Sequence, residues 1–329
     1  MIRAWCLLIL LFSLQVYSEP TELERYLEWA KYPPNSRPLE QTQVDLLDPY
    51  NSDRPPVPVS GLSAACTLIP QSAVSVGTKE FKIYLHCKSS LGQPLKVDSV
   101  KARVYTEDRG KQKASAAPRI DAGNRPDQSI QFLVKPGVQD WGDMFLEADF
   151  NVQGKRHNQR AHWFSTPHNV AEFKQGATES VRQGHLYVRI PVWIHKAGYF
   201  AFDANLFSKS GPVATSSVEG DYSAGLQTIE FQFFGKVIRD KKAGGPFTIR
   251  NIRGMRNNSP VTPSMVRDSI NGKPLPPHKE QTEPWQEFME PFAGAVTTAP
   301  HSLAVFSSLE WQSPEKTRRI QFLRGLEKK

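Results

Sequence analysis

Apolar and polar side chains alternate along several short segments of the chain, most clearly in AGYFAFDANLFSKSGPVATS at residues 197–216. Asp203 and Asn205 lie between the apolar positions, which are Phe200, Phe202, Ala204 and Leu206. A period of two is typical of a β-strand with one buried face and one face in water. We therefore predict a strand whose phenylalanines fill a core and whose Asp203 and Asn205 face water.

The same alternation recurs on both sides of this stretch. Residues 61–168 contain FKIYLHC, VDSVKARVYTE, SIQFLVKPG and DMFLEADFNVQGKRHNQRAHWFS, and residues 169–257 contain HLYVRIPVWI, LQTIEFQFFGKVI and GPFTIRNIRGM. Turn-forming Gly, Pro, Asn and Asp separate these short runs, which favours antiparallel sandwiches over a parallel sheet. The predicted fold class is mainly β, with one antiparallel sandwich over 61–168 and a second over 169–257.

Helical patterns are confined to the two ends of the chain. Within residues 19–60, Thr21 and Glu24 form a capping box, and an apolar stripe follows at Leu23, Tyr26, Leu27 and Ala30. The proline pair at 33–34 ends this helix. The proline-rich remainder is predicted to be either an arm laid over a neighbouring domain or a tether that projects the domains from a surface.

Residues 258–329 begin with a linker rich in Pro and Asn and end in a helical tail, SPEKTRRIQFLRGLEKK. Ser313 and Pro314 mark the start of this helix. Six basic and two acidic residues make the tail the most positive segment of the chain. A helix of this kind either docks on its own protein or lies on an anionic membrane, and docking is the more common outcome.

The first eighteen residues, MIRAWCLLILLFSLQVYS, combine one Arg with an apolar run and end with Val16 and Ser18 at the −3 and −1 positions. This is the pattern of a secretory signal peptide. A retained membrane anchor is the alternative, but a spanning helix needs about 20 apolar residues and Gln15 interrupts this run. We predict cleavage after Ser18, a periplasmic, secreted or cell-surface protein, and no transmembrane segment in the mature chain.

Cleavage would leave two cysteines, Cys66 and Cys87. A single pair in an exported chain forms a disulfide as a rule, and a loop of this size contributes about 3 kcal/mol in the chain-entropy model. The sequence has no C-x-x-C motif, and His86 has no partners at metal-ligand spacing. We therefore predict a structural disulfide and no redox or metal role for this pair.

The formal net charge of the chain is +8, and loss of Arg3 with the signal segment would lower it to +7. Such a balance favours anionic partners, among them surface polysaccharide, lipid headgroups and nucleic acid. The basic residues are scattered along the chain, however, so we interpret the charge as a contribution to solubility. We expect no nucleic-acid partner.

Catalytic motifs are absent from the sequence. It contains no G-x-S-x-G, no glycine-rich phosphate loop, no dinucleotide-binding fingerprint and no H-E-x-x-H. His157 and His162 are five residues apart, which places them on opposite faces of a strand and argues against a zinc site. We predict that the protein is not an enzyme and that it holds no cofactor.

Two acidic pairs near predicted turns carry the oxygen ligands that calcium prefers. They are Asp140 with Asp143 and Glu219 with Asp221. Neither pair fits a twelve-residue calcium loop, and isolated acidic pairs on turns are usually solvated. Calcium stays a minor hypothesis for these positions.

Tryptophans are the remaining candidates for a binding site. Trp141, Trp163 and Trp193 are the candidate ligand-binding residues, and Trp285 and Trp311 belong to the same set. Exposed indoles could form a platform on which sugar rings stack. Packing in a core or between domains is the more common role of tryptophan, and the sequence does not fix the relative positions of these five.

The segments AGYFAFDANLFSKSGPVATS, GLQTIEFQFFGKVI and GPFTIRNI resemble the bacterial immunoglobulin-like β-sandwich modules of exported and surface-associated proteins. YLEWAKYPPNSRPL similarly resembles a segment that precedes such modules in exported bacterial proteins of unknown function. The resemblance implies two tandem immunoglobulin-like antiparallel β-sandwiches between a helical N-terminal arm and a C-terminal helical tail, with 169–257 as the matching module and 61–168 assigned by analogy. It offers no catalytic residues to transfer. Cys66 and Cys87 are too close in sequence for the inter-sheet bridge of such modules, so we expect them to tie a first strand or arm to a neighbouring strand.

These observations favour a non-catalytic interaction or structural protein of the bacterial envelope or cell surface, with a role in adhesion or assembly. Its expected partners are proteins or polysaccharides of the envelope. The alternative is a carbohydrate-binding module that uses exposed aromatic residues. A secreted hydrolase is a third hypothesis, and it would require a cleft in which acids or histidines converge.

Overall fold

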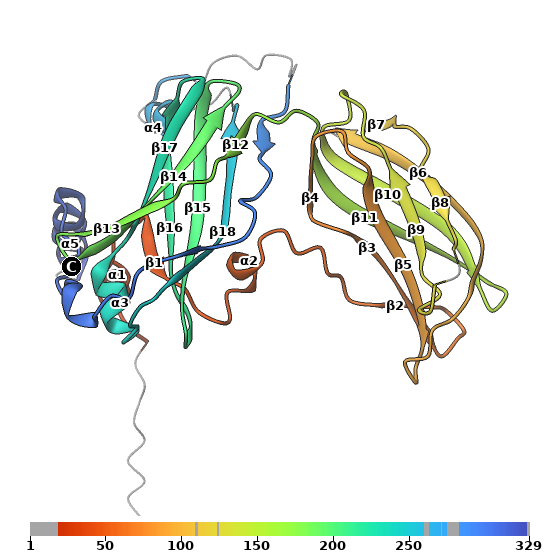
Figure 1. The fold of residues 1–329 in the computed structure, drawn as a ribbon, viewed down its shortest axis with the longest axis horizontal. Coiled ribbons are helices and arrows are strands. Elements are labelled where there is room, and N and C mark those ends of the chain that lie inside the picture. The colour runs from red at the N-terminus through yellow and green to blue at the C-terminus, as the bar shows by residue number, and fades with distance from the viewer. Residues whose placement is uncertain are drawn as a thin grey trace, which may run out of the picture. The chain divides into compact units, whose positions relative to one another are not determined.

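The computed structural model describes residues 19–108, 111–123, 125–259, 263–270, 272–274 and 283–327. The chain divides into two units, residues 35–309 and a smaller unit made of residues 1–34 and 310–329. The signal segment predicted at 1–18 lies outside the described residues. Almost all of the regular structure in the larger unit is β, and the strands form two sandwiches in succession (Figure 1).

The first sandwich contains two five-stranded sheets (Figure 1). One sheet has the order β2 (Val57–Pro58), β3 (Ala64–Pro70), β5 (Phe81–Ser89), β9 (Ile130–Val134) and β8 (Arg119–Asp121). The other has the order β4 (Val74–Val76), β11 (Lys155–Thr166), β10 (Gly142–Val152), β6 (Val97–Asp108) and β7 (Lys111–Ala114). Strand β4 runs parallel to β11, and the other described pairs are antiparallel. Two such sheets packed face to face form an immunoglobulin-type sandwich.

Alternating side chains of both sheets form the core of the first sandwich. Strand β5 buries Phe81, Ile83, Leu85 and Cys87, the face that its sequence predicted. The indole of Trp163 on β11 stacks on Phe81 with ring centroids 5.3 Å apart. Trp163 is fully buried, so this indole belongs to the packing between the two sheets.

The second sandwich is also built from two sheets. In one, β14 (His185–Ile194) pairs with β17 (Gly225–Phe233) on one side, and on the other side with β12 (Ala171–Phe173) and β13 (Thr178–Arg182). The other has the order β1 (Ser36–Pro38), β16 (Gly211–Tyr222), β15 (Gly198–Ser208), β18 (Thr248–Asn257) and β19 (Gln286–Phe288), and β20 (Val296–Thr297) also pairs with β18. All of these pairs are antiparallel. The predicted mainly β fold with two tandem sandwiches is confirmed.

The strand at residues 198–208 buries Phe200, Phe202, Ala204 and Leu206, as predicted. The prediction that Asn205 faces water is wrong, because this side chain is only 3% exposed. The short helix α2 (Val44–Leu47) lies over it, and the Asn205 amide donates a hydrogen bond of 2.6 Å to the carbonyl of Leu46. Asp203 is partly exposed and pairs with Arg253 at 3.2 Å.

Segments from both ends of the larger unit complete the second sandwich. Strand β1 belongs to the N-terminal arm and pairs with β16, and the Ser36 hydroxyl accepts a hydrogen bond of 2.9 Å from the Phe234 N–H. Strands β19 and β20 lie within the 258–329 region that the sequence assigned to linker and tail, and both add to β18. Phe306, which follows the 3₁₀ turn Leu303–Val305, is buried. Two further helices are α3 (Gly235–Asp240) and α4 (Pro263–Ile270).

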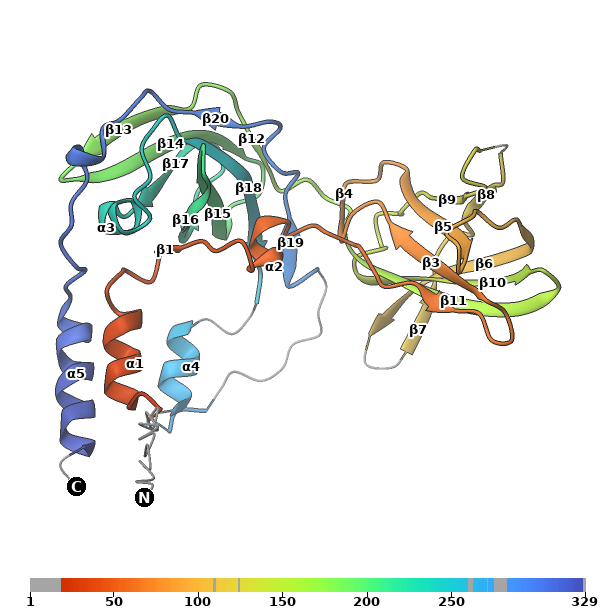
Figure 2. The same ribbon diagram turned by 90° about the horizontal axis from the view of Figure 1, so that it is seen from below.

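The smaller unit pairs two helices, α1 (Glu22–Trp29) and α5 (Pro314–Leu326), which lie side by side in Figure 2. Helix α1 has the predicted capping box of Thr21 and Glu24. Arg319 of α5 forms an ion pair of 2.9 Å with Glu22 of α1. The basic tail helix therefore packs against the N-terminal helix. In the part of the chain that the structure describes, no helix combines the length and apolar character needed to cross a membrane.

Candidate binding groove

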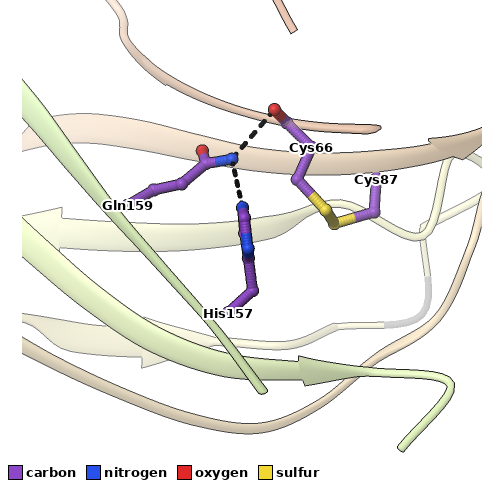
Figure 3. Close-up of a disulfide and its surroundings, with 4 residues drawn as sticks. All are labelled: Cys66, Cys87, His157 and Gln159. Atoms are coloured by element: carbon purple, nitrogen blue, oxygen red, sulfur yellow. Dashed lines mark hydrogen bonds between the residues drawn. A yellow bond between two sulfur atoms is a disulfide. The ribbon is translucent and has the colours of Figure 1, made fainter. Parts of the chain in front are cut away.

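The disulfide predicted from the sequence is present, and it joins two neighbouring strands of one sheet. Cys66 on β3 lies directly opposite Cys87 on β5, with Cα atoms 4.1 Å apart, and both residues are buried. The amide of Gln159 on the facing sheet donates a hydrogen bond of 3.0 Å to the Cys66 carbonyl and contacts His157 at 3.2 Å (Figure 3). A buried cross-strand bond of this kind is a structural element of the first sandwich.

The structure distributes the three candidate tryptophans over separate environments. Trp163 is part of the core, so it has no face on which a ligand could stack. Trp193 on β14 is 43% exposed. Trp141, in the turn between β9 and β10, is partly exposed and lines a groove together with Trp285, which is 44% exposed. The three predicted residues do not form one platform, but Trp141 and Trp285 share a site.

We call this site the tryptophan groove. It has a volume of about 770 Å³ and opens between the end of the first sandwich that carries Trp141 and the residues of the second sandwich around Trp285. Its aromatic lining residues are Trp141, Phe164 and Trp285. The volume falls within the roughly 300–1,000 Å³ typical of small-molecule sites.

The wall that carries Trp141 is held by a buried carboxylate. Asp140 accepts hydrogen bonds from the N–H of Gly137 at 2.8 Å and from the hydroxyl of Ser115 at 2.6 Å. Gly142 follows Trp141 with a φ of +84°, a conformation that favours glycine. The backbone is therefore fixed on both sides of Trp141, and this determines where the indole meets the groove.

The wall that carries Trp285 is held by its pairing with β18. The Trp285 carbonyl accepts a hydrogen bond of 2.6 Å from the Asn258 N–H. Two residues later, Glu287 is almost fully buried and pairs with Arg256 at 2.6 Å. Gln286, which lines the groove, thus lies between a backbone hydrogen bond and a buried ion pair.

Contacts between Phe288 and the first sandwich bring the two walls together. The Phe288 N–H donates a hydrogen bond of 3.0 Å to the Thr166 hydroxyl. Its ring packs edge-on against Phe164 with centroids 5.3 Å apart. Tyr50 also packs against Phe288, and burial raises the pKa of the Tyr50 hydroxyl to about 12. These contacts form the apolar base beside the groove.

The polar lining of the groove is dominated by uncharged groups. Among the described residues that line it are four side-chain amides, those of Gln112, Gln139, Asn257 and Gln286, and one cation, Lys113. The carboxylates of the same lining already have side-chain partners: Glu107 pairs with the Arg160 guanidinium at 2.8 Å, and Asp143 contacts the His162 imidazole at 2.8 Å. The Arg160 guanidinium also lies 3.6 Å from the centroid of the Phe145 ring. Neither carboxylate is positioned as an unpaired acid or base.

The other acids and histidines singled out in the sequence do not converge on one site. Asp140 and Asp143 bind different partners, as described above. Burial raises the pKa of Tyr199, and Glu219 and Asp221 of β16 raise it further. His157 contacts the core ring of Phe150, whereas His162 is exposed, so the prediction that they occupy opposite faces is confirmed. Among the described residues, no group of three or more His, Cys, Asp or Glu side chains is arranged to hold a metal ion.

The sequence did not indicate that Trp285 lies beside Trp141. The segment PWQEFMEPFAG is apolar without a clear period, so its short strand could not be recognised. Glu287 is followed by two apolar residues, Phe288 and Met289, so the segment does not show the period of two that marks a strand. The pairing of β19 with β18, which brings Trp285 to the groove, joins residues about thirty positions apart in sequence.

Comparison with known proteins gives no family. No family model matches the chain, and no curated protein matches it either. Among solved structures, a DUF4785 family protein from Legionella pneumophila matches with a TM-score of 0.41 and 14% identity, over 60% of this chain and 53% of that one. The match thus spans about half the length of the Legionella protein.

Two immunoglobulin-domain structures match more weakly. Bovine butyrophilin has a TM-score of 0.22 and 10% identity, over 56% of this chain and 87% of its own. A tandem pair of titin immunoglobulin domains has a TM-score of 0.20 and 9% identity, over 60% of this chain and 92% of its own. Identities and TM-scores this low give no basis for transferring a function to this chain.

Proposed function

We propose that this chain is an exported, non-catalytic binding protein of the bacterial envelope, and that the tryptophan groove is its binding site. The observation that carries the proposal is that two partly exposed indoles, Trp141 and Trp285, line the same groove together with several side-chain amides. Aromatic surface with a few polar groups is the usual composition of a ligand site.

A binding role fits the groove better than catalysis does. The described residues that line it include neither histidine nor cysteine. Glu107 and Asp143 each contact a side chain outside the lining, the Arg160 guanidinium and the His162 imidazole. A general base must lie within hydrogen-bond reach of the substrate, and both carboxylates are already engaged with these side chains.

Two features support export. The apolar run at 1–18 has the composition of a signal peptide, and the Cys66–Cys87 disulfide is the kind of bond that persists in oxidising compartments. Expression of the full chain in a Gram-negative host tests this part. We expect a soluble periplasmic product whose mass corresponds to a chain that begins at Glu19. A product that keeps residues 1–18 and sediments with the membranes would contradict it.

The binding role is tested by capture from a solubilised envelope fraction on the immobilised mature protein. Wild type and the control variant Trp193→Ala should retain the same component, because Trp193 is exposed but does not line the groove. The double variant Trp141→Ala/Trp285→Ala should lose that component. Equal retention by all three proteins would show that the groove is not the binding site, and this part of the proposal would fall.

A further inference from the structure

We propose that the tryptophan groove binds a short stretch of a neutral carbohydrate chain. This inference rests on the proposed function and names the class of its ligand. It follows from three properties of the described lining residues, namely the placement of the aromatic rings, the kind of polar groups between them and the balance of charge.

The aromatic rings provide flat apolar surface from both sandwiches. Trp141 belongs to the turn before β10 in the first sandwich, and Trp285 precedes β19 in the second. A pyranose ring has apolar C–H faces and a hydroxylated edge, so it can lie against an indole while its hydroxyls remain available. Indoles on two walls can hold successive or opposite sugar faces, and each indole also offers one N–H donor.

The polar groups of the groove match hydroxyls. Each of the four lining amides, on Gln112, Gln139, Asn257 and Gln286, carries both an N–H donor and a carbonyl acceptor. The Asn257 carbonyl already accepts a hydrogen bond of 2.9 Å from the Ser259 N–H. A sugar hydroxyl also donates and accepts, so amides can bind it in either role. Thr106 and Ser259 add hydroxyl groups to the same lining.

The charge balance disfavours an anionic ligand. The described lining residues include one cation, Lys113, against two carboxylates: Glu107, which pairs with Arg160, and Asp143, which contacts the His162 imidazole. A phosphate or uronate would need additional cations directed into the groove. The positive net charge of the whole chain is therefore not concentrated at this site, and a neutral oligosaccharide fits it best.

The test uses the mature full chain and neutral hexasaccharides of glucose, mannose, galactose and N-acetylglucosamine, with a galacturonate hexasaccharide as the acidic probe. Binding is measured by titration calorimetry and by the change in tryptophan fluorescence. We expect at least one neutral hexasaccharide to bind, with the acidic probe binding more weakly. Absence of binding by all four neutral probes at about 10 mM, a concentration that reveals even millimolar dissociation constants, would overturn the proposal.

Substitutions of groove residues test whether the oligosaccharide binds in the tryptophan groove. Trp141→Ala and Trp285→Ala should each weaken the affinity at least about tenfold, whereas the matched control Trp193→Ala should bind as wild type does. Trp141→Tyr keeps a flat ring and should retain intermediate affinity, which separates loss of stacking from misfolding. Gln139→Ala should weaken binding without removing either ring. Unchanged affinity in both tryptophan-to-alanine variants would refute the assignment.

The same capture experiment separates this inference from the proposed function. If the groove-dependent envelope component is destroyed by periodate and resists proteinase, the carbohydrate assignment is supported. If that component is destroyed by proteinase and resists periodate, the ligand is a protein, so the assignment fails while the binding function stands. If the double tryptophan variant captures the component as well as wild type does, both fail.

Discussion

Opening the Cys66–Cys87 bond should destabilise the first sandwich and leave the second unchanged. The bond closes a loop of 21 residues between two strands that are already paired. In the chain-entropy model a loop of that size contributes about 3 kcal/mol by restricting the unfolded chain. Reduction keeps both buried sulfur atoms in place, so the comparison of reduced with oxidised protein isolates the cross-link from the loss of packing that an alanine substitution adds.

Hydrogen exchange followed by peptide mass spectrometry is the appropriate assay, because it reads each sandwich separately. Amides of β3 and β5 report on the first sandwich, and amides of β14 and β17 serve as the internal reference. A loss of about 3 kcal/mol corresponds to exchange that is faster by roughly 100-fold. We expect that increase in β3 and β5 after reduction and no change in β14 or β17.

Two results would refute this reasoning. Exchange in β3 and β5 that rises by less than about twofold would mean that the bond restricts the unfolded chain far less than its loop length implies. An equal rise in β14 and β17 would mean that the two sandwiches unfold together. The double variant Cys66→Ala/Cys87→Ala provides the control for reductant effects, and it should be less stable than the reduced wild type because it also loses two buried sulfur atoms.

Three further predictions concern the second sandwich. In urea unfolding, Gly235→Ala should destabilise this sandwich by about 1–3 kcal/mol, because the added Cβ would overlap the backbone carbonyl of Gly184 in the β13–β14 turn. The control variant Gly244→Ala should be nearly neutral, because its Cβ would meet no atom within 4 Å. Arg256→Met should cost about 3 kcal/mol, because buried Glu287 would keep only its longer pairing of 3.8 Å with Lys196. The double variant Arg256→Met/Glu287→Leu should recover part of that loss, and a double variant less stable than the single one would contradict this. Burial lowers the pKa of His185, whose Nδ1 accepts a hydrogen bond from the Gly235 N–H. The unfolding free energy should therefore fall as the pH drops below the usual histidine pKa of about 6.5 towards the lowered pKa of the folded state. His185→Asn should make the unfolding free energy depend less steeply on pH in that range.

Local periodicity was sufficient to predict the strands that bury one face. The alternation in FKIYLHC and in AGYFAFDANLF identified the buried side chains because the period of two is a property of the strand itself. The capping box at Thr21 was equally local, since it depends on residues three positions apart. Such signals are complete within the segment that carries them, which is why they agree with the structure.

The errors and omissions concern residues whose environment is supplied by distant segments. Asn205 alternates correctly with the phenylalanines, yet it is buried because α2, about 160 positions earlier, covers it. The groove has the same origin: Trp285 meets the site of Trp141 through the pairing of β19 with β18 and the contact of Phe288 with Phe164. Neither segment contains a pattern that indicates its contact with the other. The sequence therefore identified both tryptophans as candidates but could not predict that they line the same groove.

The position of β1 has a consequence for how the chain reaches its native state. Residues 36–38 of β1 are synthesised before the first sandwich, whereas the strand that they pair with, β16, follows more than 170 residues later in the sequence. During synthesis, β1 therefore has no partner until β16 has been made. A fragment that begins at residue 169 would contain most of the strands of the second sandwich but would lack β1. The edge of β16 would then be unpaired, and an unpaired strand edge can pair with other chains. The first sandwich is thus inserted in the sequence between β1 and the other strands of the second sandwich. Trimming the second sandwich to residues 169–257 would expose an edge of β16, which loses β1, and an edge of β18, which loses β19 and β20.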